Sequence, residues 1–240
     1  MWPILVAVLL LCGCSESAPK QDQEPHISAE ASALISPVRE AIEAEKARQA
    51  ALPPPANDRE RLERMGRLDQ VGRRAAVAID LSTLPQAERA AADVAMWAPV
   101  GAEDDRLIDE LISMVPPQGW FLKSVYGEEA AGAAFLIVQH SGLEHWRRFV
   151  PVLEPLVASG EVDGEKFGLM YDRLALNEGR PQRYGTQMTC KAGKWVIDRD
   201  NLEDPENADA RRAAMGFHWT LAEYEAIFAK YPPCTGPGGR

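Results

Sequence analysis

The chain contains few of the residues from which protein metal centres are built. Only four cysteines and four histidines occur among its 240 residues. Neither a CxxC pair nor an HExxH segment is present, and these spacings are the ones typical of a structural zinc site and of a zinc-protease helix. The sequence therefore predicts no bound metal, and we expect no other cofactor.

Positive charge is also scarce. The 26 Lys and Arg residues are outnumbered by 36 Asp and Glu residues, which gives a formal net charge of −10. Nucleic acids and anionic lipid headgroups attract proteins that carry an excess of Lys and Arg. The acidic balance therefore argues against a nucleic-acid partner and against a polybasic contact with a membrane.

Long apolar segments are missing as well. The apolar run at residues 4–11 has eight residues, whereas a membrane-spanning helix needs about 20. Its length matches the core of a secretory signal peptide instead. The overall composition, 46% hydrophobic and 26% charged, is typical of a folded globular chain. No internal repeat is visible.

The apolar run ends in Leu11-Cys12-Gly13-Cys14, which resembles the bacterial lipobox. This resemblance implies that residues 1–13 are a lipoprotein signal peptide and that lipid is attached to Cys14. By the same analogy, Ser15 after the cysteine implies the outer membrane. We therefore expect a lipid-anchored protein of the bacterial cell envelope that faces the periplasm. A plain secretory signal and a chance apolar start are the alternatives, and no Lys or Arg precedes the run as it does in the usual signal.

Two cysteines remain after the signal peptide and the lipidation site are set aside. They are Cys190 and Cys234. Exported proteins fold in an oxidising compartment, where cysteines left over as a pair are candidates for a disulfide. We expect a Cys190–Cys234 disulfide, and the alternative is two separate thiols.

The rest of the chain divides into a tether, one domain and a tail. Residues 14–28 are polar and read as a lipidated tether, residues 29–231 as a helical globular domain, and residues 232–240 as a flexible tail. Apolar residues recur at helical spacing through most of the domain. Two segments have a pattern typical of β-strands. They are residues 183–190 and 194–198, which lie on either side of a Lys-Ala-Gly turn. The predicted fold is mainly α, a multi-helix domain with one small β-hairpin.

Two local expectations bear on the site. The acidic residues Glu103, Asp104 and Asp105 suit a helix N-terminus, so we expect one helix to end near Trp97 and another to begin at these acids. The alanine-rich segment at residues 128–140 is apolar all round, which predicts a buried central helix. A buried strand at residues 135–138 is the alternative.

Polar side chains adjoin apolar runs in several separate segments. Gln139 and His140 end the predicted central helix, and Asp172 and Arg173 lie off the apolar stripe of a later helix. Because polar residues beside buried runs are normally partnered, we expect these segments to converge on one polar pocket. The remaining candidates are Gln182, Tyr184, Thr186, Gln187 and Arg212.

These polar pieces also resemble a bacterial family known only as a domain of unknown function. The resemblance covers about residues 104–228, and it implies no activity, substrate or mechanism. Its value is that the pieces belong to one domain. They are Gly119-Trp120, Gln139-His140, Asp172-Arg173, Pro181-Gln182, Tyr184-Gly185-Thr186-Gln187, Arg211-Arg212 and Glu223-Tyr224.

Two interpretations of the polar residues stay open. In the functional one, His140 carries a proton and is oriented by Asp172, while Arg173 or Arg212 holds an anionic group and Tyr184 or Gln187 orients the ligand. In the structural one, the same residues form a buried network that fixes the hairpin to the helices. The first predicts an envelope protein with a pocket for a small-molecule or protein partner, or an envelope hydrolase or transferase that uses His140 and Asp172. The second predicts a non-catalytic assembly protein.

Overall fold

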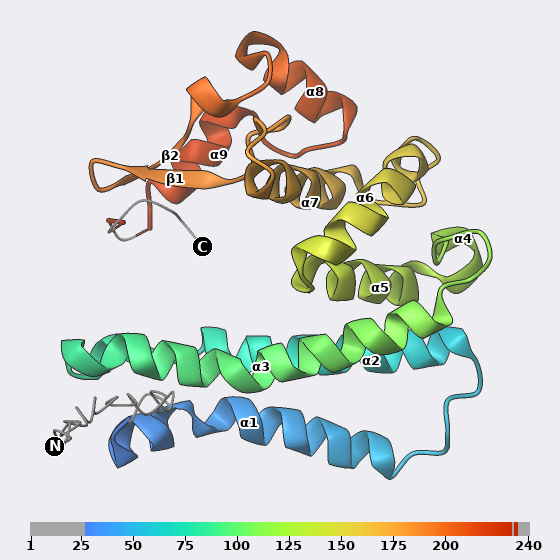
Figure 1. Ribbon diagram of the computed structural model, residues 1–240, viewed down its shortest axis with the longest axis vertical. Coiled ribbons are helices and arrows are strands. Elements are labelled where there is room, and N and C mark those ends of the chain that lie inside the picture. Colours follow the sequence, from blue (N-terminus) through green and yellow to red (C-terminus); the bar gives the residue numbers. More distant parts are fainter. Residues whose placement is uncertain (1–26, 232, 235–240) are drawn as a thin grey trace, which may run out of the picture.

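The computed structural model describes residues 27–231 together with residues 233 and 234 (Figure 1). Within this part of the chain the fold is mainly α-helical with one two-stranded hairpin, which confirms the predicted fold class. The elements are α1 (Ala29–Ala50), α2 (Asp58–Val77), η1 (Leu81–Thr83), α3 (Gln86–Met114), α4 (Lys123–Tyr126), α5 (Glu128–His140), α6 (Leu143–Ala158), α7 (Gly164–Asn177), β1 (Met188–Lys191), β2 (Lys194–Ile197), η2 (Arg199–Asn201), η3 (Pro205–Asn207), α8 (Ala208–Ala214) and α9 (Leu221–Phe228).

Several expectations concern residues that the structure does not describe. The predicted signal peptide at residues 1–13, the lipidation site Cys14 and most of the tether lie outside the described residues. So does the predicted tail, apart from residues 233 and 234. Among the described helices, none combines the length and the apolar character that a membrane span requires.

Helices α1, α2 and α3 pack side by side, and α5 lies between them and the α6–α7 pair (Figure 1). Helix α5 is the buried central helix that its composition predicts. Seven of its residues are buried, and residues 135–138 are helical, so the alternative of a strand there is wrong.

Two small residues set the spacing between α2 and α5. A Cβ atom added to Gly66 would lie 2.6 Å from the Cβ of Ala133, a separation that real Cβ atoms do not reach. The two helices can therefore approach this closely only because Gly66 has no side chain. The contact matters for the site because Asp69 lies one turn further along α2 and His140 two turns further along α5.

The expectation that one helix ends near Trp97 and another begins at residue 103 is wrong, because α3 spans both segments. Helix α3 runs without a break from Gln86 to Met114 and contains Pro99. Proline removes one backbone donor and clashes with the preceding turn, but apolar residues on both sides of Pro99, including Met96 and Leu107, are buried in the core. This burial offsets the local cost. Asp104 consequently lies within a helix that packs on α2, where it faces other side chains rather than beginning a helix.

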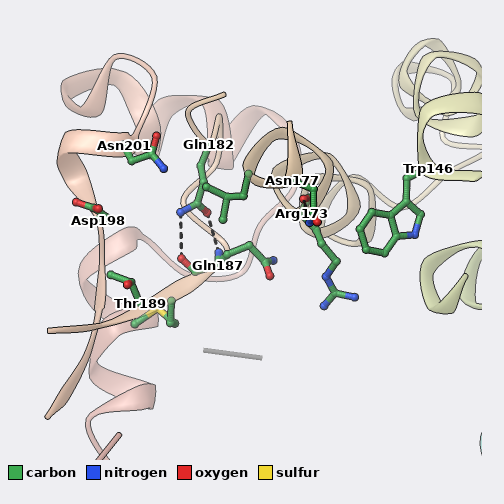
Figure 2. Close-up of a pocket in the computed structure, with 10 residues that line it drawn as sticks. Trp146, Arg173, Asn177, Gln182, Gln187, Thr189, Asp198 and Asn201 are labelled. Carbon is green, nitrogen blue, oxygen red and sulfur yellow. Dashed lines mark hydrogen bonds between the residues drawn. The ribbon is translucent and has the colours of Figure 1, made fainter. Parts of the chain in front are cut away.

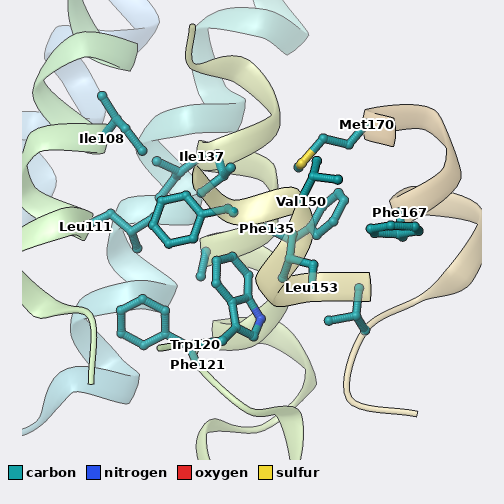
Figure 3. Close-up of a cluster of buried hydrophobic side chains, with 14 of the residues drawn as sticks. Ile108, Leu111, Trp120, Phe121, Phe135, Ile137, Val150, Leu153, Phe167 and Met170 are labelled. Carbon is teal, nitrogen blue, oxygen red and sulfur yellow. The ribbon is translucent and has the colours of Figure 1, made fainter. Parts of the chain in front are cut away.

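The largest cluster of buried apolar side chains joins α5 to α6 and α7 (Figure 3). Its aromatic centre is Trp120, whose ring centroid lies 6.0 Å from that of Phe121 and 5.5 Å from that of Phe149, both in edge-on contacts. Such contacts stabilise beyond the area they bury. The cluster fixes the position of α6 relative to α5, and therefore of Trp146 relative to the last turn of α5.

The hairpin forms around the predicted turn, but its first strand begins at Met188 and not at residue 183. Residues 183–187 form a loop instead, because backbone N–H groups in this segment bond the carboxylate of Asp172. Strands β1 and β2 are antiparallel, with Cys190 opposite Trp195 and Lys191 opposite Lys194. Cys190 and Cys234 form a disulfide, which confirms the predicted pairing. The backbone N–H of Ile197 donates to the carboxylate of Glu225 in α9 at 2.8 Å, so the hairpin is fixed both to α9 and to the end of the described chain.

Candidate functional site

Asp172 has a structural role in this fold. Its side chain is fully buried, and its carboxylate accepts hydrogen bonds from the backbone N–H groups of Arg183 (2.7 Å), Tyr184 (3.1 Å) and Thr186 (2.9 Å). Burial raises the pKa of Asp172, and these three donors oppose that rise. The carboxylate therefore holds the loop before β1 in place. The expectation that Asp172 orients His140 is wrong, because the carboxylate beside His140 belongs to Asp69.

The other residues of this loop extend the same network. The side-chain amide of Gln182 accepts from the N–H of Gln187 at 2.8 Å and donates to its carbonyl at 3.0 Å. Arg212 is buried and donates to the carbonyl oxygens of Tyr184 and Trp219, both at 2.8 Å. The side chains of Asp172, Gln182 and Arg212 thus satisfy backbone groups, as the structural interpretation predicts.

A pocket of about 430 Å³ opens beside this network, between α6, α7 and the start of the hairpin (Figure 2). Three of its lining residues, Arg173, Gln182 and Gln187, are predicted ligand-binding candidates. The others carry no expectation from the sequence. The lining residues are Trp146, Arg173, Leu176, Asn177, Gln182, Gln187, Met188, Thr189, Asp198 and Asn201.

Arg173 is the cation of this pocket that lacks an anionic partner. Its guanidinium carbon lies 5.7 Å from the ring centroid of Trp146, and it forms no ion pair and no side-chain hydrogen bond with any described residue. Burial lowers the pKa of Arg173, because the charge has lost hydration without gaining a carboxylate. Other partly buried arginines, such as Arg73 and Arg183, are paired with Asp or Glu.

The remaining polar groups of the pocket are mostly neutral. The side-chain nitrogen of Gln187 donates to the hydroxyl of Thr186 at 3.0 Å, and its side-chain oxygen Oε1 accepts no hydrogen bond from a described residue. Asn177, Thr189 and Asn201 add further neutral donors and acceptors around the cavity. The carboxylate of Asp198 is already paired with Lys191 at 2.8 Å.

A second polar cluster surrounds His140 and includes residues that the sequence analysis missed. The Nδ1 atom of His140 lies 2.8 Å from Oδ1 of Asp69, whose side chain is 1% exposed. One guanidinium nitrogen of Arg73 lies 2.5 and 2.6 Å from the two carboxylate oxygens of Asp104. Burial raises the pKa of Asp104, although Arg73 acts in the opposite direction. Helices α2, α3 and α5 therefore each contribute to one acid–base cluster.

This cluster also has the ligand types of a cation site. Single ligand atoms of Asp69, Asp104 and His140 lie within 4.8 Å of one another. Carboxylate oxygens and an imidazole nitrogen suit several divalent metals. However, the guanidinium of Arg73 already bonds both oxygens of Asp104, so a metal ion would have to displace a charge-paired arginine.

Trp146 contacts both the helix end that bears His140 and the Arg173 side of the pocket. Its indole Nε1 donates to the carbonyl oxygen of Val138 in the last turn of α5 at 2.9 Å, two residues before His140. The face of the same ring carries the guanidinium of Arg173. The end of α5 that bears His140 and the wall of the pocket therefore meet at one side chain. Gln139 is half-buried, and its side chain forms no hydrogen bond with another described residue, so the structure brings it into neither the pocket nor the His140 cluster.

The position of Asp69 could have been recognised from the sequence. Residues Met65, Asp69, Gly72 and Ala76 follow one another at intervals of three or four and are all buried. A carboxylate on the buried stripe of an amphipathic helix needs a partner. Asp69 is not among the candidates because only polar residues beside longer apolar runs are considered.

The structure defines a helical domain with a polar pocket beside α7. The family of unknown function DUF6624 matches residues 65–230. This is more than half of the chain, and the protein belongs to this family. The match begins earlier than the predicted residue 104, so it includes Asp69 and Arg73 as well as the pocket. No curated protein and no solved structure matches the chain.

Proposed function

We propose that the protein is a lipid-anchored envelope protein whose pocket binds a small ligand carrying a carboxylate or phosphate group. The observation that carries this proposal is the unpaired guanidinium of Arg173 inside a polar pocket. A desolvated cation without a counter-ion is costly, and an anionic ligand would supply the missing partner.

The chemistry of the lining narrows the ligand class. A guanidinium presents parallel N–H donors that match carboxylate and phosphate oxygens. The neutral groups of Gln187, Asn177 and Asn201 suit hydroxyl or amide groups on the rest of the ligand. Ligand sites for small molecules have volumes of about 300 to 1,000 Å³, and the pocket, at about 430 Å³, fits a small metabolite or one or two residues of a peptide.

The location is part of the same proposal and rests on different support. The Leu11-Cys12-Gly13-Cys14 segment resembles a lipobox, and the disulfide between Cys190 and Cys234 suits an oxidising compartment. The polar residues between Cys14 and α1 would let the domain stand away from the membrane.

Isothermal titration calorimetry tests ligand binding. Glutarate and inorganic phosphate represent the two anion types, and glutaramide is the uncharged counterpart of glutarate. We expect at least one anion to bind and the diamide not to bind. Arg173→Gln should weaken the anion about 10- to 100-fold, because a charged hydrogen bond contributes about 1.5 to 3 kcal/mol.

Arg148→Gln is the matched control. Arg148 also lies over an aromatic ring, 4.9 Å from the centroid of Phe149, but it is exposed and does not line the pocket. Its substitution should leave the affinity unchanged. Equal loss in both variants, or no binding of either anion, would contradict the proposed ligand site.

The anchor is tested separately with Cys14→Ala in cells fed a labelled fatty acid. We expect the unchanged protein to carry the label and to fractionate with membranes, and the variant to lose both properties. A variant that remains labelled would exclude lipidation at Cys14.

A further inference from the structure

We infer that the ligand of this pocket is a carboxylate with an N–H donor on the adjacent carbon. Free α-amino acids and the C-terminal residues of peptides share this chemistry. The inference rests on the proposed anion site and deepens it, because it names the part of the ligand that lies next to the group held by Arg173. It follows from which hydrogen-bonding groups of the pocket are left open by the fold.

Gln187 offers the pocket an acceptor and no donor. Its side-chain nitrogen donates to the hydroxyl of Thr186 at 3.0 Å and to the carbonyl oxygen of Leu169 at 3.4 Å. A carbonyl oxygen only accepts, so the nitrogen of the amide must face Leu169. A primary amide has two N–H groups, and these two contacts use both. Oε1 is therefore the part of the Gln187 amide that remains for a ligand.

Asn177 is oriented in the same way. It lies one turn after Arg173 on α7, and its side-chain nitrogen donates to the backbone carbonyl oxygen of Arg173 at 2.8 Å. Oδ1 of Asn177 accepts no hydrogen bond from a described residue. Figure 2 shows the side-chain amide of Gln187 extending toward the guanidinium of Arg173, with Asn177 on the same side of the pocket. An anion bound to Arg173 would thus have two open acceptor oxygens beside it.

These two acceptors distinguish between kinds of anion. A phosphate group presents acceptor oxygens on every side, and such oxygens would repel Oε1 of Gln187 and Oδ1 of Asn177. A carboxylate with a neighbouring N–H gives acceptors to Arg173 and a donor to the amide oxygens. Because a desolvated acceptor left without a donor weakens binding, the pocket favours an α-amino or α-acylamino carboxylate over a phosphate.

The charges of the lining lead to the same conclusion. Among the described residues that line the pocket, Arg173 is the one cation and Asp198 the one carboxylate. Asp198 is bonded to Lys191, which does not line the pocket, so no second positive charge is available to a ligand there. A single guanidinium balances one carboxylate, whereas a phosphate monoester carries about two negative charges at neutral pH.

Isothermal titration calorimetry with a matched pair of ligands tests the inference. N-acetyl-L-alanine has a carboxylate with an N–H on the adjacent carbon. (S)-2-acetoxypropanoate has a similar shape and the same charge, but an ester oxygen replaces the N–H. We expect N-acetyl-L-alanine to bind at least about 10-fold more tightly, because the ester oxygen leaves the amide acceptors unpaired. Inorganic phosphate should bind more weakly than N-acetyl-L-alanine.

Free L-alanine, compared with propanoate, provides the same test for an amino group. We expect L-alanine to bind more tightly than propanoate, which has no donor. Tighter binding of L-alanine than of N-acetyl-L-alanine would identify a free amino acid as the ligand. The reverse order would identify the C-terminal residue of a peptide.

Substitutions separate recognition of the N–H from recognition of the charge. Gln187→Met has no Oε1, so the affinity for N-acetyl-L-alanine should fall toward that for the ester. Asn177→Ala removes the other acceptor from an exposed residue, and it should also reduce the preference if Gln187→Met does not fold. Arg173→Gln should weaken both ligands by the same factor, since both carry the carboxylate. Gln86→Met is the control, because Gln86 is exposed at the start of α3 and should affect neither ligand.

The outcomes separate this inference from the proposed function. If both ligands bind equally and both need Arg173, or if phosphate binds more tightly than N-acetyl-L-alanine, the inference is wrong and the anion site stands. If N-acetyl-L-alanine is preferred but Arg173→Gln does not weaken it, the proposed anion site is wrong and the recognition of N–H donors is supported. Failure of every ligand to bind at millimolar concentration would overturn both.

Discussion

Replacement of Asp172 tests the network that shapes the pocket wall. In Asp172→Ala the backbone N–H groups of Arg183, Tyr184 and Thr186 lose the carboxylate that they share. These donors all lie in residues 183–186, in the loop before β1. Because the side chain of Asp172 is fully buried, we expect water to reach the vacated site poorly and the donors to remain unpaired.

The magnitude follows from two opposing effects. Each buried donor left without a partner costs about 1 to 3 kcal/mol, so three donors give about 3 to 9 kcal/mol. The substitution also removes a carboxylate that burial penalises, as its raised pKa shows. Breaking a buried charged interaction costs about 3 to 5 kcal/mol in other proteins, and we expect a loss in the free energy of unfolding of that size.

Urea denaturation followed by circular dichroism measures this loss. Asp105→Ala is the control, because Asp105 is exposed and its removal should change stability by no more than about 0.5 kcal/mol. Asp172→Asn should fall between the two, since an amide has one oxygen to accept and one NH₂ group that faces donors. A loss below about 1 kcal/mol in Asp172→Ala would refute the reasoning, since that is the least expected for a single unpaired donor.

Three further predictions concern other parts of the fold. Gly66→Ala should destabilise the protein by about 1 to 3 kcal/mol, because the new Cβ would lie 2.6 Å from Ala133, whereas Gly132→Ala, with nothing within 4 Å, should be neutral or stabilising; equal urea midpoints would contradict this. Cys234→Ser should lower the free energy of unfolding by up to about 4 kcal/mol for the 44-residue separation, the value for a loop of this size from chain entropy, and a loss under about 0.5 kcal/mol would show that the cross-link is not needed. Glu165 raises the pKa of His218, so the ion pair between them stabilises the fold below the ordinary pKa of histidine, and this stabilisation is lost as pH rises through the raised pKa. The melting temperature of the unchanged protein should therefore fall more than that of His218→Gln between about pH 6 and about pH 8. Parallel melting curves for the two proteins would show that this ion pair does not contribute to stability.

The sequence predicts those features that depend on local patterns. Helical spacing and the turn before Lys194 are enough to place most helices and the hairpin. A local pattern fails to predict a helix correctly when contacts with residues distant in the sequence determine where that helix begins and ends. Pro99 is tolerated inside α3 because residues on both sides of it are buried, and no neighbour in sequence shows that burial.

The candidate site likewise has residues that local patterns predict and residues that they do not. Arg173 and Gln187 are identified because polar residues beside apolar runs stand out in the sequence, and both line the pocket. The partner of His140 is not identified, since Asp69 lies 71 residues earlier in the chain. Its approach depends on the absent side chain of Gly66. A contact that depends on the distance between two helices has no signature in either helix alone.

The hydrogen bond between Ile197 and Glu225 has a consequence for solubility. A two-stranded hairpin leaves one edge of each strand unpaired, and such edges recruit strands from other molecules. Beside β2, the carboxylate of Glu225 takes the N–H of Ile197. A side chain of α9 thus occupies a donor of β2 that a strand from another copy of the protein would otherwise use.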